Sequence, residues 1–346
     1  MKKTIAILFG GQSSEYSVSL QSAAAVIRAI DTEIYDLLLI GIDPKGKWFH
    51  FQGNIDEIET DTWKQHATPA FLSPDTSVHG IVEIHSNDIK IYKIDVAFPV
   101  LHGKNGEDGT VQGLLTLAGI PCIGCGVLSS ALCMDKDRAH KIALISGIKV
   151  PHSVIIDKVG TKDQLCTWTK ELSYPLFVKP VHAGSSFGIS RVEEAAELSK
   201  AVAFAFLYDT EVIVEEAIDG FEVGCAVMGK EELTVGEPDE IELSEGFFDF
   251  TEKYTLKTSK IHMPARINKE TKTQIQKTAC EIYRAMGCSG FARVDFFLTK
   301  ENEIYFNEVN TIPGFTSHSR FPNMMKGAGY TFEQLIMSLI AQEVEP

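Results

Sequence analysis

Four polar side chains near the end of the chain alternate with apolar ones along two neighbouring apolar runs. Arg293 and Asp295 lie on the first run, and Glu308 and Asn310 lie on the second. A tight turn centred on residues 301–302 would place Asp295 opposite Glu308. In the same register Arg293 faces Asn310, and because strand side chains alternate between the two faces, all four share one face. Opposed carboxylates repel each other unless a cation lies between them, and such oxygen ligands suit Mg²⁺. The pattern predicts a metal site between Asp295 and Glu308, with a hydrated, exposed hairpin face as the alternative.

A second pattern suits a phosphate group. An apolar run delivers Lys179, and a short segment rich in glycine and serine follows at 184–188. Such a loop exposes backbone N–H groups that bind phosphate oxygens, and the lysine would supply the compensating charge. An ordinary turn beside a solvated lysine explains the same residues equally well. The segments 41–47 and 224–230 have the glycine and lysine spacing of a P-loop but lack its hydroxyl residue, so we reject both.

Two further segments carry residues suited to substrate recognition. The stretch 310–320 has a Pro-Gly turn, several hydroxyls and Arg320, a combination that suits a carboxylate or another polar group. The stretch 244–260 lacks clear periodicity and is rich in Ser, Thr, Lys and aromatic residues. Loops of this length in compact proteins are usually functional, so we expect a lid over an active site.

Composition limits the class of protein. The chain has 346 residues, of which 44% are hydrophobic, enough for two or three domains with real cores. Its net charge of −15 argues against nucleic-acid or membrane partners and favours small-molecule substrates. No apolar run approaches the length of a membrane span, and the apolar stretch after the first lysines is too short for a signal peptide. Seven scattered cysteines indicate reduced thiols and a cytoplasmic location, and the lone pair Cys122 and Cys125 fits two thiols better than zinc.

Alternating apolar strands and helical stretches predict an α/β fold. The first 125 residues are typical of one doubly wound unit, in which ligands bind beyond the carboxyl ends of the strands. The loops 10–14 and 102–109 lie at that edge. A helix over 128–146 and a smaller α/β piece follow. The strands expected here are 4–9, 35–42, 94–101, 150–156, 176–181, 189–192 and 211–218, and the helices 17–30, 162–172 and 193–206.

Taken in order, these motifs resemble the D-alanine–D-alanine ligases of the ATP-grasp superfamily over essentially the whole chain. The resemblance rests on Phe9-Gly10-Gly11, Glu15, Val18-Ser19-Leu20, the 102–109 loop, Met134-Asp135-Lys136, Lys179-Pro180, Gly184-Ser185-Ser186, Glu215, Glu222, Arg293-Val294-Asp295, Glu308-Val309-Asn310 and the segment 313–319. It implies an ATP-grasp fold with an N-terminal doubly wound (Rossmann-like) domain at 1–125. A small lobe at 126–218 and a large lobe at 219–346, with the metal site and a closing loop at 244–260, would complete the chain.

The resemblance also implies roles for individual residues. Such enzymes phosphorylate the carboxylate of a first D-alanine with ATP, and a second substrate then attacks the acyl phosphate. The nucleotide would be held by Lys136, Lys179, Glu215, Glu216, Ala217, Ile218 and Glu222. Two Mg²⁺ ions, with Mn²⁺ as an alternative, would be held by Asp295, Glu308 and Asn310. Glu15 would bind the first ammonium group near His102, Arg293 and Gly314 would stabilise the oxyanion, and Ser185 and Tyr254 would complete the site. Relatives of this kind are typically homodimers.

The second substrate is indicated by two segments. Lys253 and Tyr254 are both present, which favours an amine nucleophile, whereas ordinary dipeptide ligases carry an apolar residue where this chain has Arg320. The combination resembles the D-alanine–D-serine ligases of vancomycin resistance, most closely the G type, with Phe248 and Ser319 also near the substrate. An apolar pocket discriminates against one hydroxyl only about a hundredfold, and a polar partner can do better. The alternatives are that Arg320 merely pairs with a carboxylate at the rim, that the chain is a housekeeping D-alanine–D-alanine ligase, or that it is an inactive ATP-binding regulator.

Overall fold

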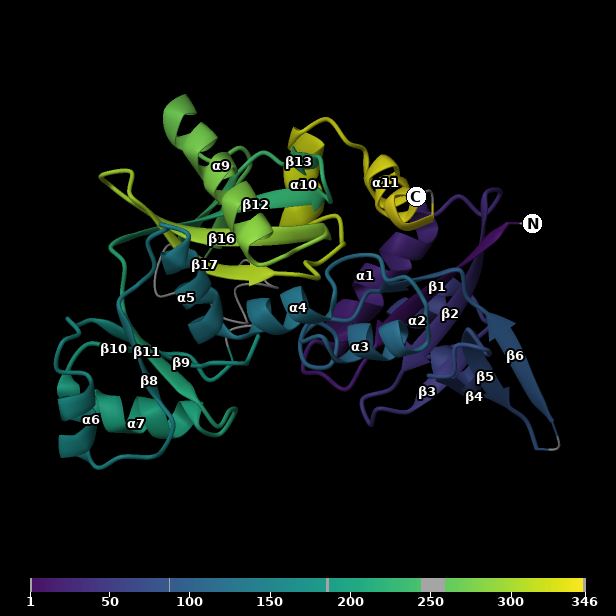
Figure 1. Ribbon diagram of the computed structural model, residues 1–346, viewed down its shortest axis with the longest axis horizontal. Coiled ribbons are helices and arrows are strands. Elements are labelled where there is room, and N and C mark those ends of the chain that lie inside the picture. The colour runs from purple at the N-terminus through teal and green to yellow at the C-terminus, as the bar shows by residue number, and fades with distance from the viewer. Residues whose placement is uncertain (1, 87, 185–186, 244–258, 345–346) are drawn as a thin grey trace.

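The computed structural model describes residues 2–86, 88–184, 187–243 and 259–344, which form three β-sheets flanked by helices (Figure 1). The N-terminal sheet has seven strands, the central sheet four and the C-terminal sheet six. The mixed α/β class predicted from the alternating pattern is confirmed. No helix within these ranges is long and apolar enough to cross a membrane.

The N-terminal sheet has the strand order β6-β5-β4-β3-β2-β1-β7, and only β2, β1 and β7 run parallel. The doubly wound part is therefore confined to three strands, and β3 to β6 form an antiparallel extension that the sequence analysis did not predict. The elements are β1 (Lys3–Gly10), α1 (Tyr16–Ala29), β2 (Tyr35–Ile42), β3 (Trp48–Phe51), α2 (Ile55–Glu59), β4 (Ala67–Leu72), β5 (Gly80–Ile84), β6 (Ile89–Lys93), β7 (Val96–Pro99) and α3 (Thr110–Leu117), with a 3₁₀ turn at Trp63–His66.

Two helices then lead into the central sheet. The single helix expected over 128–146 is wrong: the structure has α4 (Val127–Met134) and α5 (Lys136–Ile145). Asp135 lies between them in an extended conformation, and its side chain accepts a hydrogen bond from the Arg138 backbone N–H. An aspartate that caps a helix competes with helix continuation, which explains the break. The cap also fixes where α5 begins, and with it the position of Lys136, the first residue of that helix.

The central sheet is antiparallel in the order β10-β9-β11-β8. Its helices pack on one face over a core of buried valines, leucines and alanines (Figure 1). The elements are β8 (Ser153–Ile156), α6 (Lys162–Trp168), β9 (Leu176–Pro180), β10 (Ser190–Val192), α7 (Ala195–Ala205) and β11 (Val212–Glu216).

In the C-terminal sheet the long strand β16 pairs with β12 on one side and β17 on the other. Helix α9 covers one face, α10 packs against β12, and α11 runs back to the N-terminal part, where it lies against α1 (Figure 1). The elements are β12 (Gly220–Gly229), β13 (Leu233–Val235), β14 (Asp239–Leu243), β15 (Ser259–His262), α9 (Lys269–Ala285), β16 (Gly290–Thr299), β17 (Ile304–Asn310), α10 (Arg320–Gly327) and α11 (Phe332–Val344).

The register of β16 and β17 confirms the predicted pairing, although the turn between the two strands is not centred where it was predicted. Asp295 lies opposite Glu308 and Arg293 lies opposite Asn310. Near the turn, however, Leu298 pairs with Ile304, which centres the turn one half-residue earlier than expected. A bulge in β17 then adds one unpaired residue, position 307, and restores the predicted partners.

A cluster of phenylalanines joins the N-terminal and C-terminal sheets. Phe291 on β16 is fully buried, with ring centroids 6.0 Å from Phe98 on β7 and 5.3 Å from Phe315. Phe321 at the start of α10 packs against the same ring at 5.7 Å. These rings belong to a single buried cluster that runs from β1 to α11. The cluster therefore fixes the position of β16 relative to the loops at the end of the N-terminal sheet.

Replacement of Phe291 by alanine is expected to lower the free energy of unfolding by about 3–5 kcal/mol, because the cavity left between the sheets cannot fully collapse. Denaturant unfolding followed by circular dichroism measures the change. Phe71→Ala serves as the matched control, since Phe71 is 45% exposed, and it should alter stability little. Equal losses in the two variants would contradict the assignment of Phe291 as the joint between the sheets.

Candidate active site

Two cavities meet between the three sheets. The first has a volume of about 690 Å³ and is lined mainly by the central and C-terminal sheets. The second has about 550 Å³ and lies between the N-terminal loops and the segment 308–320. Lys136, Ala183 and Glu308 line both cavities. A molecule in one cavity can therefore meet a molecule in the other at this junction.

The first cavity gathers most of the residues expected to bind ATP. Its lining includes Lys136, Lys179, Ala217, Ile218 and Glu222. Two others do not line it. Glu215 is fully buried and forms an ion pair with Lys179, whereas the Glu216 carboxylate accepts a hydrogen bond from the Ser173 backbone N–H at 2.7 Å and is turned away.

Strand pairing explains why Lys179 and Glu215 meet. β9 and β11 run antiparallel, and Lys179 lies opposite Ile213, two residues before Glu215, so both side chains emerge on the same face. The Glu215 Oε2 atom is buried and accepts no hydrogen bond from any described residue. Since a buried polar atom normally has a partner, this oxygen is an exception behind Lys179, which does line the first cavity.

The second cavity is lined by the described residues expected to bind the amino-acid substrates, Glu15, His102, Ser319 and Arg320. Also in its lining are the expected oxyanion donors Arg293 and Gly314 and the expected metal ligands Glu308 and Asn310. Glu15 is buried at the start of α1, and it lies against two glycines. A Cβ on Gly103 would lie 2.4 Å from Glu15 Oε2, and one on Gly184 would lie 3.6 Å from it. Gly103 also has a φ of +73°, so a side chain there is excluded twice, by conformation and by the carboxylate.

His102 joins the two ends of this cavity. Its Nδ1 atom lies 2.8 Å from the Ile312 carbonyl oxygen and its Nε2 atom lies 3.0 Å from Ser22 Oγ. A carbonyl only accepts, so Nδ1 carries the proton and Nε2 accepts from the serine hydroxyl. Burial lowers the pKa of His102, which favours this neutral form. The ring therefore acts as a fixed spacer that holds the segment 311–314 against the N-terminal loops.

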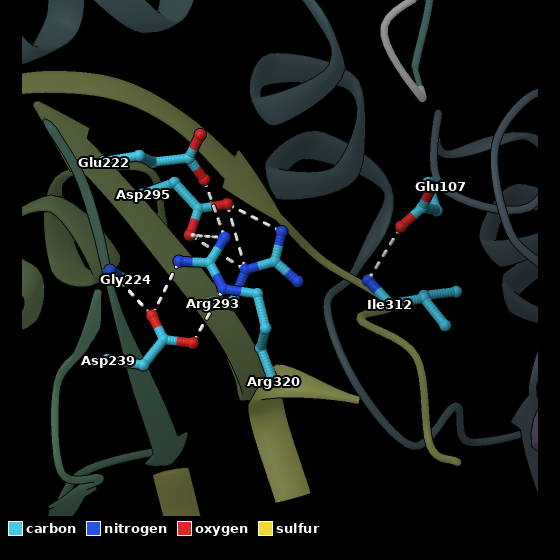
Figure 2. A network of polar contacts seen from close by, with 8 residues as sticks. All are labelled: Glu107, Glu222, Gly224, Asp239, Arg293, Asp295, Ile312 and Arg320. Atoms are coloured by element: carbon cyan, nitrogen blue, oxygen red, sulfur yellow. Dashed lines mark hydrogen bonds and ion pairs between the residues drawn. The ribbon is translucent and has the colours of Figure 1, made fainter. Parts of the chain in front are cut away.

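Arg293 and Asp295 form a buried ion pair at the side of this cavity (Figure 2). Arg293 Nε donates to both carboxylate oxygens at 2.8 and 2.9 Å, and Nη2 donates to Oδ2 at 2.7 Å. The cation predicted to lie beside Asp295 is thus, in part, a guanidinium. The pair holds Arg293 in a fixed orientation along the cavity wall, as an oxyanion-stabilising donor requires.

Arg320 is held by three carboxylates (Figure 2). Its Nε and Nη2 atoms donate to Asp239 at 2.8 and 2.7 Å, and Nη1 donates to Glu222 at 2.7 Å and lies 3.3 Å from Asp295. Burial by itself lowers the pKa of Arg320, but the attraction of Asp239 and Asp295 outweighs it, so its pKa stays above the ordinary value. The alternative of a simple pairing at the rim is therefore wrong in one respect: the arginine is paired, but it is buried and lines the second cavity.

Asp239 and Glu107 belong to the site although the sequence analysis did not single them out. Asp239 is fully buried at the start of β14 and also accepts a hydrogen bond from the Gly224 N–H at 3.1 Å. Glu107 lines the second cavity and accepts from the Ile312 N–H at 3.1 Å (Figure 2). Burial, followed by the charge of Glu15, raises the pKa of Glu107 to about 8. Glu107 lies in the 102–109 loop that the sequence did flag, whereas no local pattern connects Asp239 with Arg320.

The residues predicted to bind metal offer carboxylate oxygens from two paired strands. Two carboxylates from paired strands, Asp295 and Glu308, lie opposite each other, and the Glu308 side chain faces the junction of the two cavities. The Asn310 amide is best oriented with its nitrogen donating to Glu107 Oε1 at 2.9 Å. Within the described ranges no three His, Cys, Asp or Glu residues form a metal cluster, so any ion here would also need an amide and substrate oxygens.

Four of the expected site residues lie outside the described residues: Ser185, Phe248, Lys253 and Tyr254. The expected lid at 244–260 falls there too, apart from its last two positions. Their roles stay predictions.

Comparison with known proteins agrees with this geometry. The chain matches the family model "D-ala D-ala ligase N-terminus" over residues 4–125 and "D-ala D-ala ligase C-terminus" over residues 145–341. It is 46% identical to a D-alanine–D-alanine ligase of Caldicellulosiruptor bescii over 99% of this chain and 96% of that protein. It is 44% identical to the vancomycin B-type resistance protein VanB of Enterococcus faecalis over 99% of each chain.

Among solved structures, that of the VanG D-Ala:D-Ser ligase from Enterococcus faecalis is similar, with a TM-score of 0.93 and 57% identity over 99% of this chain and 100% of that chain. The matches cover both halves of the chain and confirm the resemblance inferred from the ordered motifs. The chain belongs to the D-alanine–D-alanine ligase family and has its ATP-grasp fold.

Proposed function

We propose that the protein is an ATP-dependent ligase that joins D-alanine to D-serine for modified peptidoglycan precursors and vancomycin resistance. One observation carries the choice of D-serine: the buried, fixed guanidinium of Arg320 lines the second cavity, where ordinary dipeptide ligases are expected to be apolar. The similarity to a structure described as a D-Ala:D-Ser ligase supports the same choice.

In this proposal the junction of the cavities is where the phosphoryl group is transferred. Lys136 and Lys179 neutralise ATP phosphates from the first cavity, and Glu15 binds the ammonium group of D-alanine in the second. An oxygen of the D-alanine carboxylate then attacks the γ-phosphorus, the bond to the bridging oxygen breaks, and ADP leaves. Magnesium held by Asp295, Glu308 and Asn310 would neutralise charge on the phosphates. Transfer of this kind depends on positioning and charge neutralisation.

In the second step the D-serine nitrogen attacks the acyl-phosphate carbonyl carbon. The new C–N bond forms, the C–O bond to phosphate breaks, and the departing phosphate takes up the proton that the nitrogen loses. Negative charge develops on the carbonyl oxygen, and the buried guanidinium of Arg293 and the N–H of Gly314 are the donors for it. Arg293 is fixed before the reaction by its hydrogen bonds to Asp295.

In this proposal, selectivity for D-serine rests on an N–H of the Arg320 guanidinium that its carboxylate partners leave available to a hydroxyl. Three carboxylates orient the guanidinium, so it lacks the freedom to turn toward water when D-alanine binds. A serine hydroxyl can accept a hydrogen bond from such a donor, and a methyl group offers nothing in return. Sites built to bond a hydroxyl discriminate more strongly than apolar pockets do.

A competition experiment tests this proposal. Purified protein is given ATP, Mg²⁺ and equimolar D-alanine and D-serine at neutral pH, and the dipeptides are identified by mass. We expect D-alanyl-D-serine as the main product. A predominance of D-alanyl-D-alanine, or better turnover with D-alanine as the sole amino acid, would contradict the D-serine assignment while leaving the ligase family intact.

A second candidate is a housekeeping D-alanine–D-alanine ligase, which the relative from Caldicellulosiruptor bescii favours at 46% identity. The same competition experiment separates the two. An inactive ATP-binding regulator is disfavoured because the expected catalytic and metal residues Glu15, Lys136, Lys179, Arg293, Asp295, Glu308 and Asn310 are all present. The homodimer and the cytoplasmic location stay predictions.

A further inference from the structure

His182 lies between two parts of the nucleotide site without lining either cavity. It follows β9 and directly precedes Ala183, which lines both cavities, and Gly184, which lines the second. Its ring is held from two sides. Nδ1 lies 2.9 Å from Asp209 Oδ2, and Nε2 lies 3.1 Å from Asp135 Oδ2.

Both ring nitrogens of His182 therefore face carboxylate oxygens, which only accept hydrogen bonds. A neutral imidazole has a single N–H, so it satisfies one of the two contacts and turns a lone pair toward the other carboxylate. The imidazolium satisfies both. The His182 backbone N–H also donates to Asp209 Oδ2 at 2.6 Å, which fixes the residue itself in place.

Asp135 connects this contact to the ATP-binding lysine. Asp135 caps α5, and Lys136 is the first residue of that helix. Lys136 is joined to the chain around His182 at both of its ends: its backbone N–H donates to the Val181 carbonyl at 3.3 Å, and its Nζ donates to the Ala183 carbonyl at 2.8 Å. His182 adds a third link between these two segments, because its Nε2 atom contacts the Asp135 carboxylate. Lys136 and the start of the glycine-rich segment are thus held as one unit.

We propose that His182 is a positioning residue for ATP: its imidazolium holds Lys136, Ala183 and Gly184 in the arrangement that binds the phosphates, and loss of the proton weakens nucleotide binding. The inference rests on the proposed use of the first cavity for ATP and is independent of the choice between D-serine and D-alanine. It gives the protein a dependence on pH that acts on nucleotide affinity, apart from the ionisation of the amino-acid substrates.

The charged groups around His182 support the direction of this effect. Asp135, from the start of α5, and Asp209, from the turn after α7, face the ring, and the Arg138 guanidinium binds the same Asp135 oxygen, Oδ2, that faces His182 Nε2. Hydrogen bonding to Asp135 outweighs partial burial and, with the charge of Asp209, raises the pKa of His182 to about 8. A raised pKa means that the stabilising contact is complete at lower pH and is lost as the pH rises through about 8.

Binding of Mg·ATP without amino acids, measured by titration calorimetry, tests the proposal in a readout that needs no turnover. For the wild type we expect the dissociation constant to rise about fivefold between about pH 7 and about pH 9. His182→Arg keeps a positive charge over this range and should bind ATP with little dependence on pH. His182→Gln keeps a polar side chain without the charge and should bind weakly at both pH values.

Three outcomes would overturn the proposal: a wild-type dissociation constant that does not change with pH, the same rise in His182→Arg as in the wild type, or tight binding by His182→Gln at both pH values. If His182 had only a structural role, both variants would bind ATP equally weakly, and the pH dependence of the wild type would have no explanation. Failure of the proposed function is distinguishable from these results, since a protein that is not a D-serine ligase but binds ATP still shows the pH profile. A protein that binds no ATP at neutral pH loses both proposals.

Discussion

Glu308→Gln should reduce ATP-dependent ligation by at least about a thousandfold, as expected when a charge that neutralises a transferring phosphoryl group is mispositioned. Glu308 lines both cavities and lies opposite Asp295, so its carboxylate lies at the junction where, in the proposed function, ATP and the amino acid meet. Glutamine keeps the shape of the side chain and one oxygen but removes the negative charge that attracts Mg²⁺. Phosphate release and dipeptide formation with saturating ATP and amino acids measure the effect.

Glu303→Gln is the matched control for this variant. Glu303 lies in the turn between β16 and β17, just before β17 begins. It is exposed and pairs with Lys149 outside both cavities. We expect normal activity from it and an unchanged unfolding midpoint in both variants. Normal turnover by Glu308→Gln would refute the metal assignment. A large loss of activity in the control would instead mean that the assay reports damage to the paired strands β16 and β17 and not the chemistry of Glu308.

The part of the site that could be predicted from the sequence is the part built by residues close together in the chain. β16 and β17 are joined by a short turn, so the alternation of side chains was enough to place Asp295 opposite Glu308. Even there the prediction succeeded through two compensating features, a shifted turn and a one-residue bulge. A bulge depends on its surroundings: here the carbonyl of the bulged residue Asn307 accepts a hydrogen bond from buried His140 on α5.

Contacts between distant segments were not predictable in this way. Asp239 precedes Arg320 by 81 residues, and the two meet because β14 pairs with β12 while α10 packs over the same sheet. The antiparallel strands β3 to β6 were missed for a related reason. Their alternation of buried and exposed residues is interrupted, and several of their apolar side chains are exposed, as Ile89 and Ile91 are. The tendency of a residue to form a strand depends more on how its side chain packs against its neighbours than on an intrinsic backbone preference. Strands whose packing depends on distant neighbours are therefore hard to predict from the sequence.

Arg320→Leu tests the origin of substrate choice and the energetics of the buried cluster together. Leucine makes the end of the second cavity apolar, and we expect the preference for D-serine to be lost in the competition experiment, with D-alanyl-D-alanine becoming the main product. The same change leaves the carboxylates of Asp239, Glu222 and Asp295 without their shared cation. Breaking a buried ion pair from one side is expected to lower the free energy of unfolding by about 3–5 kcal/mol.

Two further variants separate substrate choice from stability. Adding Asp239→Asn to Arg320→Leu removes the charge left without its closest partner, so the double variant should recover part of the lost stability without regaining the preference for D-serine. Arg28→Leu is the matched control: Arg28 also binds two carboxylates, Asp56 and Glu59, but its side chain is 42% exposed, and the loss should stay below about 1 kcal/mol. Strictly additive effects of the two site substitutions would show that Asp239 and Arg320 are not coupled. An unchanged share of D-alanyl-D-serine from Arg320→Leu would remove Arg320 from substrate recognition altogether, because its role would then be confined to neutralising the carboxylates around it.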